Sequence, residues 1–267
     1  MIFDWGGTLT PWKNIDGRSW WRIVEQLVAA GRVPADHVDK IATLLATAEE
    51  EAWRRSRDEH RSCTLAEIFA TAGLTLDDTA EAIHAQEWEW ATHLDPQAPA
   101  VLTALRERGI RIGVLSNTVW PRARHEHIFI RDGVHHLIDG AVYTSEIPWT
   151  KPHPKAFHAA MSSVGASDPA RCVYVGDRPF DDIYGARQAG MRAVLIPNSQ
   201  IPEVQRGHTD GEPDAVITCL ADLLEIVDGW LGREGTSVAT AGVGTATIAP
   251  AAGTIVSAAG ALEAEDA

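Results

Sequence analysis

Short apolar runs alternate with amphipathic stretches along the second half of the chain. Residues 98–109, 153–165 and 181–190 carry apolar side chains at helical spacing, and each stretch ends at a glycine. This pattern predicts an α/β fold in which helices cover both faces of a parallel sheet. The predicted strands are residues 1–3, 110–115, 172–175, 193–196 and 215–217.

The hydrophobic pattern changes between residues 18 and 93, where four stretches have helical periodicity and no strand-like run separates them. We therefore expect a small α-helical domain inserted between the first and second strands. The predicted boundaries give a core of residues 1–12 and 95–230 and a helical domain of residues 13–94.

Both ends of the chain depart from this pattern. The stretch "MIF" is short for a central strand, so we expect further residues upstream of Met1. Residues 231–267 are rich in Ala, Gly and Thr and contain no aromatic residue. Such a segment buries too little apolar surface to offset the entropy lost on ordering. We expect a low-complexity, disordered tail, although its β-propensity is also compatible with an added edge strand.

Composition and charge exclude several kinds of partner. The 267 residues include 37 acidic and 23 basic side chains, and the net charge of −14 repels nucleic acids and anionic membranes. No stretch reaches the roughly 20 apolar residues of a membrane span, and no basic segment precedes an apolar one at the N-terminus. We expect a cytoplasmic protein in which Cys63, Cys172 and Cys219 are reduced thiols.

Asp4 stands at the carboxyl end of the first predicted strand, the edge at which an open α/β sheet binds its ligands. Gly6 and Gly7 let the chain turn sharply and bring backbone amides close to an anion, and Thr8 adds a hydroxyl. An aspartate with two glycines close behind it is also typical of an ordinary turn, so this segment indicates a catalytic site only in combination with other segments.

Three later segments place further polar groups at the same edge. Ser116 and Asn117 end the second strand with groups suited to a phosphoryl oxygen, and Lys151 precedes prolines that fix the backbone before a helix. After the strand at 172–175, carboxylates crowd together and would repel one another unless a cation held them. These acids are Asp177, Asp181 and Asp182.

The order Asp-x-Gly-Gly-Thr-Leu, Ser-Asn, Lys-Pro-x-Pro and Gly-Asp-x-x-x-x-Asp resembles the haloacid dehalogenase-like (HAD) hydrolase superfamily over about residues 1–225. The resemblance implies a Rossmann-like core, an α-helical cap inserted after the first motif, and Mg²⁺ as cofactor. It also implies a hydrolase, most simply a phosphatase that acts on a small phosphorylated metabolite.

The same resemblance assigns the catalytic roles. Asp4 would be the nucleophile that attacks phosphorus and forms an aspartyl-phosphate. Ser116 or Asn117 would hold the transferring group, and Lys151 would neutralise its charge and that of Asp4. The substrate-binding residues would be Asn117, Thr8 and Gly7.

The resemblance also implies a metal site. The ligands of Mg²⁺ would be the carboxylates of Asp4 and Asp177 and the backbone carbonyl of Gly6. Asp182 would support the metal through its waters or orient the lysine, with Asp181 as the alternative.

Gly6 departs from most phosphatases of this family, which carry there a second aspartate that protonates the leaving group. General acid–base assistance is worth about 10²–10⁴-fold. Its loss favours leaving groups that need little protonation, such as acyl phosphates, or the recruitment of another acid, for which Asp16 is the nearest candidate.

Two alternatives to a phosphatase follow from the same glycine. Phosphonoacetaldehyde hydrolases of the family also lack the second acid and cleave a C–P bond, but they need a Schiff-base lysine, for which Lys40 and Lys13 are the candidates. A non-catalytic binding protein is the other alternative. True dehalogenases also lack the second acid but work without magnesium, so the retained Asp177 and Asp182 argue against them.

Tryptophans and histidines are the other residues considered for a site. Most tryptophans are expected in the core of the helical domain, whereas Trp5, Trp12 and Trp20 could line an apolar pocket near the nucleophile. The stretch "RARHEHIFIRDGVHH" lacks the spacing of a zinc site, so we expect surface histidines there. They are His125, His127, His135 and His136.

Overall fold

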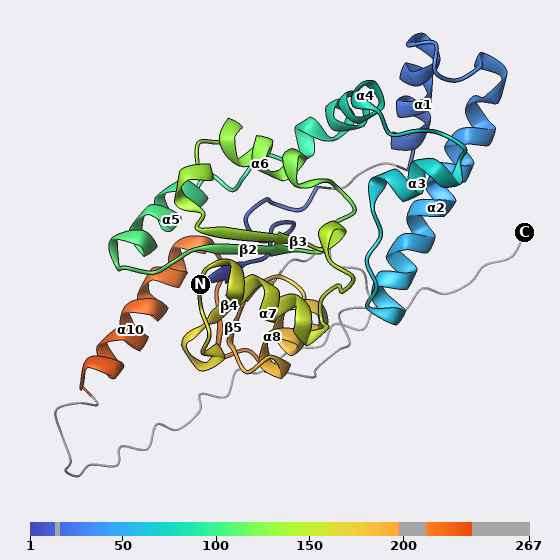
Figure 1. The fold of residues 1–267 in the computed structure, drawn as a ribbon. Helices are drawn as coiled ribbons and strands as arrows, with labels where there is room; N and C mark the ends of the chain where they lie inside the picture. The colour runs from blue at the N-terminus through green and yellow to red at the C-terminus, as the bar shows by residue number, and fades with distance from the viewer. Residues whose placement is uncertain (14–16, 198–211, 237–267) are drawn as a thin grey trace, which may run out of the picture. The chain divides into compact units, whose positions relative to one another are not determined.

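The computed structural model describes residues 1–13, 17–197 and 212–236, and its centre is a six-stranded parallel sheet with the order β3-β2-β1-β4-β5-β6 (Figure 1). The strands are β1 (Ile2–Phe3), β2 (Gly113–Ser116), β3 (Gly140–Tyr143), β4 (Val173–Gly176), β5 (Arg192–Leu195) and β6 (Ala215–Val216). The predicted α/β fold is confirmed, and β3 is a strand that the apolar pattern did not predict. Because β1 pairs with both β2 and β4, Asp4 leaves the middle of the sheet.

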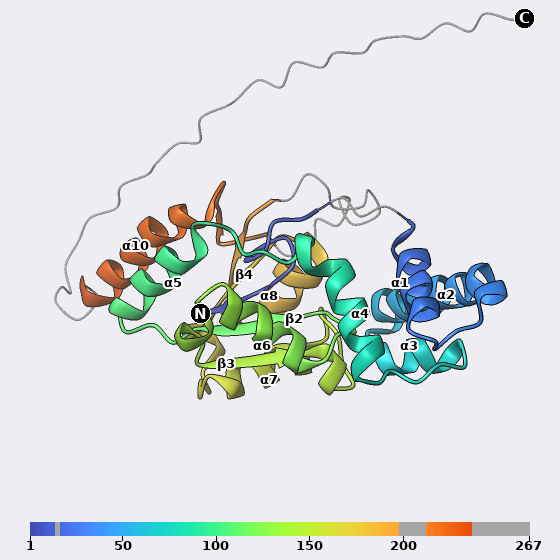
Figure 2. The ribbon, with the colours of Figure 1, turned by 90° about the horizontal axis from the view of Figure 1, so that it is seen from above.

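Helices cover both faces of the sheet. In both views α5 (Ala98–Glu107) and α6 (Arg122–Arg131) lie on one face, and α7 (Pro154–Ser163) and α8 (Gly185–Gln188) lie on the other (Figures 1 and 2). Helix α5 buries Ala98, Val101, Leu102 and Leu105, which is the spacing of one helical stripe against a core. The short turns are η1 (Ala35–His37), η2 (Glu89–Ala91), η3 (His135–Leu137), η4 (Thr144–Glu146), η5 (Pro169–Arg171), the π-helical η6 (Pro179–Tyr184) and η7 (Leu220–Asp222).

Helix α10 (Leu223–Thr236) follows β6 and begins beside α5, where Arg108 Nε donates to Asp228 Oδ1 at 2.7 Å. The helix includes residues 231–236, the first part of the predicted tail, and the remainder of that tail lies outside the described residues. Residues 1–228 form one compact unit. The division of this unit into a core and a cap therefore stays a prediction.

Four helices occupy the segment between β1 and α5, as the helical periodicity predicted. They are α1 (Ser19–Ala29), α2 (Val38–Glu59), α3 (Leu65–Thr71) and α4 (Asp78–Trp88). Helix α3 begins at a capping box in which Thr64 and Glu67 satisfy each other's backbone amides. The four helices share a core with Val119 and Trp120, which lie in the loop after β2. We call residues 17–93 the helical insert.

The end of α2 is bonded to the loop that precedes Lys151. The Thr150 amide donates to the His60 carbonyl at 3.1 Å, and the Thr150 hydroxyl donates to the Ser56 carbonyl at 3.1 Å. Arg61 and Trp149 form an isolated antiparallel bridge in the same place. The insert is therefore tied to the carboxyl edge of the sheet by backbone groups.

The expectation of surface histidines is wrong for one of the four. His127, His135 and His136 are exposed, but His125 is fully buried on α6 and stacks on Tyr143 with ring centroids 4.4 Å apart. Its Nε2 lies 3.1 Å from the Thr118 hydroxyl. The buried face of α6 includes His125 and, one helical turn later, Phe129. The many polar residues of this helix obscure that periodicity in the sequence.

The described residues bear on two expectations, one about membrane-spanning helices and one about the state of the cysteines. None of the helices there is both long and apolar enough to cross a bilayer. Cys63, Cys172 and Cys219 are free, and the first two are buried.

Candidate active site

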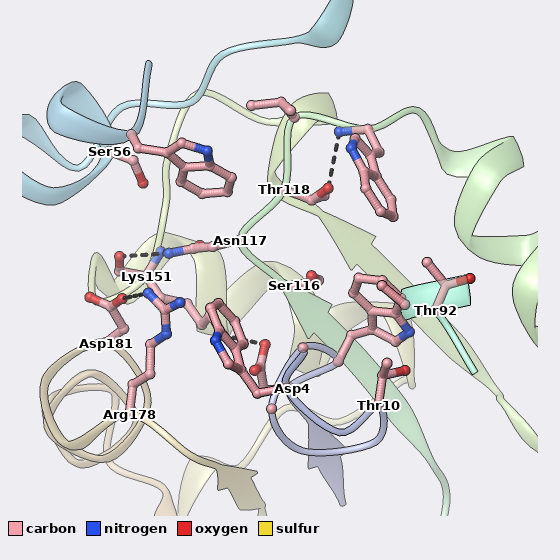
Figure 3. Close-up of a pocket in the computed structure, with 18 of the residues that line it drawn as sticks. Asp4, Thr10, Ser56, Thr92, Ser116, Asn117, Thr118, Lys151, Arg178 and Asp181 are labelled. Carbon is pink, nitrogen blue, oxygen red and sulfur yellow. Dashed lines mark hydrogen bonds and ion pairs between the residues drawn. The ribbon is translucent and has the colours of Figure 1, made fainter. Parts of the chain in front are cut away.

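Strand β1 delivers Asp4 into a buried site at the carboxyl edge of the sheet. The Asp4 amide donates to the Val175 carbonyl at 2.8 Å, which continues the pairing with β4, and the residue is only 5% exposed. Lys151 Nζ lies 2.6 Å from Asp4 Oδ1 and 2.7 Å from Asp182 Oδ1. Figure 3 shows Asp4, Ser116, Asn117 and Lys151 around one cavity. The structure thus brings together residues from four separate segments, as the sequence motifs predicted.

Lys151 is held at both its backbone and its ammonium group. The Asn117 side chain accepts a hydrogen bond from the Lys151 amide at 2.8 Å and donates one to the Lys151 carbonyl at 3.1 Å. The ammonium donates to the Tyr174 hydroxyl at 2.9 Å, and that hydroxyl donates to the Leu115 carbonyl at 3.0 Å. Asn117 therefore positions the lysine through its side-chain amide, and its role in substrate binding stays a prediction.

The charge of Lys151 is stabilised by its neighbours. Burial acts to lower the pKa of the lysine, but the carboxylates of Asp182 and Asp4 outweigh this effect and raise the pKa above its ordinary value. The ammonium is therefore protonated and offers a fixed positive charge beside the proposed nucleophile.

Three carboxylates crowd this single ammonium. Asp4, Asp177 and Asp182 each offer an oxygen, and these oxygens lie within 4.8 Å of one another. Burial raises the pKa of Asp4 to about 6 against the lowering effect of Lys151, and burial together with Asp182 and Asp4 raises the pKa of Asp177 well above its usual range. A site with this excess of buried negative charge favours a bound cation.

The hydrogen bonds separate the roles of these acids. Asp182 uses one oxygen for Lys151 and the other for the amide of Arg178, at 2.9 Å. Both oxygens of Asp177 are buried and have no hydrogen-bond partner among the described residues. Oxygen-rich, unpaired and anionic groups of this kind fit a divalent cation such as Mg²⁺; Asp177 and Asp4 have carboxylate oxygens available to hold it, whereas both oxygens of Asp182 are engaged.

The loop after Asp4 depends on Gly7 more than on Gly6. Gly7 has φ +89°, and a Cβ at this position would collide with the carboxylate of Asp177. A Cβ at Gly6 would have only the Trp12 ring near it, at 4.0 Å. Both glycines line the cavity. The second acid of most family phosphatases is therefore missing at a position that has room for a side chain.

Some of the remaining predicted residues line the cavity and others do not. Ser116 lines the cavity, whereas Thr8 is buried outside its lining and Thr10 stands there instead. Lys13 lines the cavity and Lys40 does not. Asp16 lies outside the described residues.

The motifs did not single out Arg178 as a site residue. It lines the cavity beside Asp181, which lies 3.4 Å from its guanidinium, and Figure 3 shows the two side chains facing each other. Burial acts to lower the pKa of Arg178, but Asp181 and Asp177 raise it overall. In the sequence, the position of Arg178 directly after Asp177 was the one feature that could have marked it as a site residue.

The cavity has a volume of about 430 Å³, and its lining includes five tryptophans. Trp20 does not take part, because it is buried in the insert and its indole N–H donates to Glu49 at 2.7 Å. Trp5 and Trp12 line the cavity, in agreement with the sequence analysis. The full set of lining tryptophans is Trp5, Trp12, Trp53, Trp88 and Trp120.

The sequence is similar to those of curated phosphatases. The glyceraldehyde 3-phosphate phosphatase of Methanothermobacter thermautotrophicus is 35% identical over 134 residues, which are 49% of this chain and 58% of the relative. The phosphoserine phosphatase of Thermus thermophilus is 34% identical over 110 residues, 41% of this chain and 43% of the relative. The chain thus spans about half the length of the curated relatives it matches.

A solved structure and a family model extend the likeness beyond these segments. The HAD phosphatase from Thermococcus onnurineus has a similar fold, with a TM-score of 0.59 at 21% identity over 85% of this chain and 97% of that one. A family model described as haloacid dehalogenase-like hydrolase matches residues 1–190. The chain therefore belongs to the haloacid dehalogenase-like hydrolases.

Proposed function

We propose that the protein is a magnesium-dependent phosphatase that acts on a small phosphorylated metabolite. The observation that carries the proposal is the buried group of Asp4, Lys151 and Asp177, in which Lys151 places a positive charge beside Asp4 and Asp177 offers two oxygens without a hydrogen-bond partner among the described residues. The names of the relatives from Methanothermobacter and Thermus, both phosphatases of small metabolites, support the same class of substrate.

The proposed reaction proceeds in two displacements at phosphorus. A carboxylate oxygen of Asp4 attacks the phosphoryl group, the bond from phosphorus to the ester oxygen breaks, and the leaving oxygen takes a proton from solvent water. Water then attacks the aspartyl-phosphate, which releases inorganic phosphate and restores the carboxylate. Lys151 offsets negative charge that develops on the phosphoryl oxygens, and Ser116 offers a hydroxyl at the same edge.

The metal would be held by the carboxylates of Asp4 and Asp177 and the carbonyl of Gly6. A divalent cation bound there offsets the charge of the carboxylates and of the phosphoryl group. Asp182 keeps Lys151 in place beside Asp4 through its ion pair.

Gly6 leaves the loop without the acid that would protonate the leaving group. We expect the enzyme to favour leaving groups that depart with little proton donation, such as acyl phosphates. C–P cleavage of the phosphonoacetaldehyde hydrolase kind is the second candidate, because Lys13 lines the cavity and could serve as its amine.

A panel of phosphate esters with acetyl phosphate included, assayed with magnesium and with EDTA, tests the proposal. We expect turnover with magnesium only. Equal turnover in EDTA would overturn the metal requirement. An absence of both turnover and acid-trapped aspartyl-phosphate would overturn the phosphatase and favour a binding protein.

A further inference from the structure

Tryptophan rings from both the sheet edge and the insert face the cavity. Trp5 follows β1, Trp120 follows β2, and Trp88 ends α4. The ring centroids of Trp5 and Trp120 are 5.6 Å apart and those of Trp88 and Trp120 are 5.8 Å apart, both with edge-to-face geometry. The three rings therefore form one packed wall. A planar aromatic ligand can bury its ring against such a wall, whereas a polyol would place hydroxyls against indole carbons.

The same wall carries polar atoms without partners. Trp5 Nε1, Trp88 Nε1 and Thr10 Oγ1 are buried, and none of them makes a hydrogen bond to any part of the chain that the structure describes. All three residues line the cavity, and Thr10 is only 3% exposed. A buried donor without a partner is unfavourable, and an acceptor on a bound ligand removes that penalty.

One of these donors lies next to the proposed nucleophile. Trp5 follows Asp4 in sequence, and the Thr10 amide donates to the Trp5 carbonyl at 2.8 Å, so the hydroxyl of Thr10 is held on the same loop. The wall thus begins beside the phosphoryl site and continues through Trp120 to Trp88 on the insert. A substrate with its phosphate at Asp4 would direct its leaving group along these rings.

We propose that the substrate is a phosphate monoester whose leaving group contains an aromatic ring bearing an oxygen acceptor, such as a carboxylate. The ring packs on the wall of Trp5, Trp88 and Trp120, and the acceptor receives hydrogen bonds from the indole N–H groups and the Thr10 hydroxyl. This inference rests on the proposed phosphatase activity. It adds the chemical class of the leaving group.

Matched esters separate ring recognition from leaving-group chemistry. Benzyl phosphate and cyclohexylmethyl phosphate both release a primary alcohol of similar size, and only the first is aromatic. We expect kcat/KM to be at least about tenfold higher for benzyl phosphate, and higher again for 4-carboxybenzyl phosphate. Equal kcat/KM for the benzyl and cyclohexylmethyl esters would overturn the inference.

Variants that remove the donors test whether the protein binds the acceptor of the ligand. Trp88→Phe keeps a ring and removes the N–H, so it should abolish the advantage of 4-carboxybenzyl over benzyl phosphate, measured as the ratio of the two kcat/KM values within the variant. Thr10→Val tests the same point at a second position. Trp90→Phe is the control, because Trp90 is 51% exposed and does not line the cavity. An unchanged advantage in both Trp88→Phe and Thr10→Val would contradict the role of these donors.

A binding measurement keeps this inference separate from the proposed function. Benzylphosphonate and cyclohexylmethylphosphonate have no ester bond to hydrolyse, and calorimetric titration of the whole protein with magnesium gives their affinities. Tighter binding of benzylphosphonate without turnover of any ester would support the aromatic site and overturn the phosphatase. Turnover of esters together with equal affinities for the two phosphonates would support the phosphatase and overturn the aromatic site.

Discussion

The Lys151 ammonium lies 2.6 Å from Asp4 Oδ1, and both side chains are buried. Burial raises the pKa of Asp4 to about 6, and Lys151 limits this rise because its charge favours the carboxylate. The proposed nucleophile is therefore held near a permanent positive charge before any phosphate arrives. Since Asp182 and Tyr174 fix the same ammonium, its position does not depend on the substrate.

Replacement of the proposed nucleophile should remove activity and leave the fold intact. We expect Asp4→Asn to lower phosphate release by at least about a thousandfold, because the amide cannot accept the phosphoryl group. The thermal midpoint should not fall, since the change removes a charge from a crowded acidic site. Phosphate release and circular dichroism measure the two outcomes, and Asp58→Asn on the exposed face of α2 is the control. Trapped phosphoenzyme in Asp4→Asn would contradict the assignment.

Asp177 should show opposite effects with and without metal. Without magnesium, Asp177→Asn should raise the thermal midpoint by roughly 2–6 °C, because a buried carboxylate with no hydrogen-bond partner in the described structure loses its charge. With magnesium, the wild type should be stabilised and the variant should not. Thermal scans at several magnesium concentrations measure this. Equal magnesium-induced shifts in both proteins would exclude Asp177 as a ligand.

An acid restored at position 6 should broaden the range of esters. Gly6→Asp has room, since only Trp12 approaches a Cβ at this position, at 4.0 Å. We expect hydrolysis of alkyl phosphates to rise by about 10- to 100-fold relative to acetyl phosphate, because the new carboxyl can protonate the leaving alcohol. Gly6→Asn is the matched control, as it has the same shape and cannot act as the acid. Brisk cleavage of alkyl phosphates by the wild type would show that another group already supplies the proton.

The buried His84 should make stability depend on pH. Burial, assisted by Arg124, lowers the pKa of His84 from 6.5 to about 3, so between these values the unfolded chain binds a proton that the folded chain excludes. Stability should therefore fall as the pH drops from about 6.5 towards 3. His84→Phe should flatten this dependence by up to about 1.4 kcal/mol per pH unit. Denaturant unfolding between pH 4 and 7 measures the slope, with the exposed His127→Phe as the control. An unchanged slope in His84→Phe would contradict the assignment.

Much of the fold and of the site followed from local sequence. The apolar runs predicted β1, β2, β4, β5 and β6, because strands buried on both faces are continuous in hydrophobicity. Parallel strands end at a common edge, so Asp4, Ser116 and Asp177 could be placed together without coordinates, and the family resemblance added Lys151. Strand β3, an edge strand in which only two of four residues are buried, was not predicted, and α6 was missed because its polar residues obscure the helical period.

Other features depend on tertiary contacts that spacing does not encode. The roles of Asp181 and Asp182 were left open, and the π-helical turn η6 separates them by turning Asp182 towards Lys151 and Asp181 towards Arg178. Trp53, Trp88 and Trp120 join the cavity only because the insert packs over the loop after β2. Neither the helical positions of Trp53 and Trp88 nor the loop position of Trp120 gave a sign of that contact.

The bonds between Thr150 and the end of α2 have a consequence for protein engineering. Thr150 is bonded twice to the insert, through His60 and Ser56, and Lys151 is the next residue in the chain. A grafted insert from another member of the family would have to present matching backbone groups at these two positions, or it would shift the lysine as well as the substrate pocket. Exchange of the insert alone is therefore a change to the catalytic centre, and residues 148–151 should be transplanted with it.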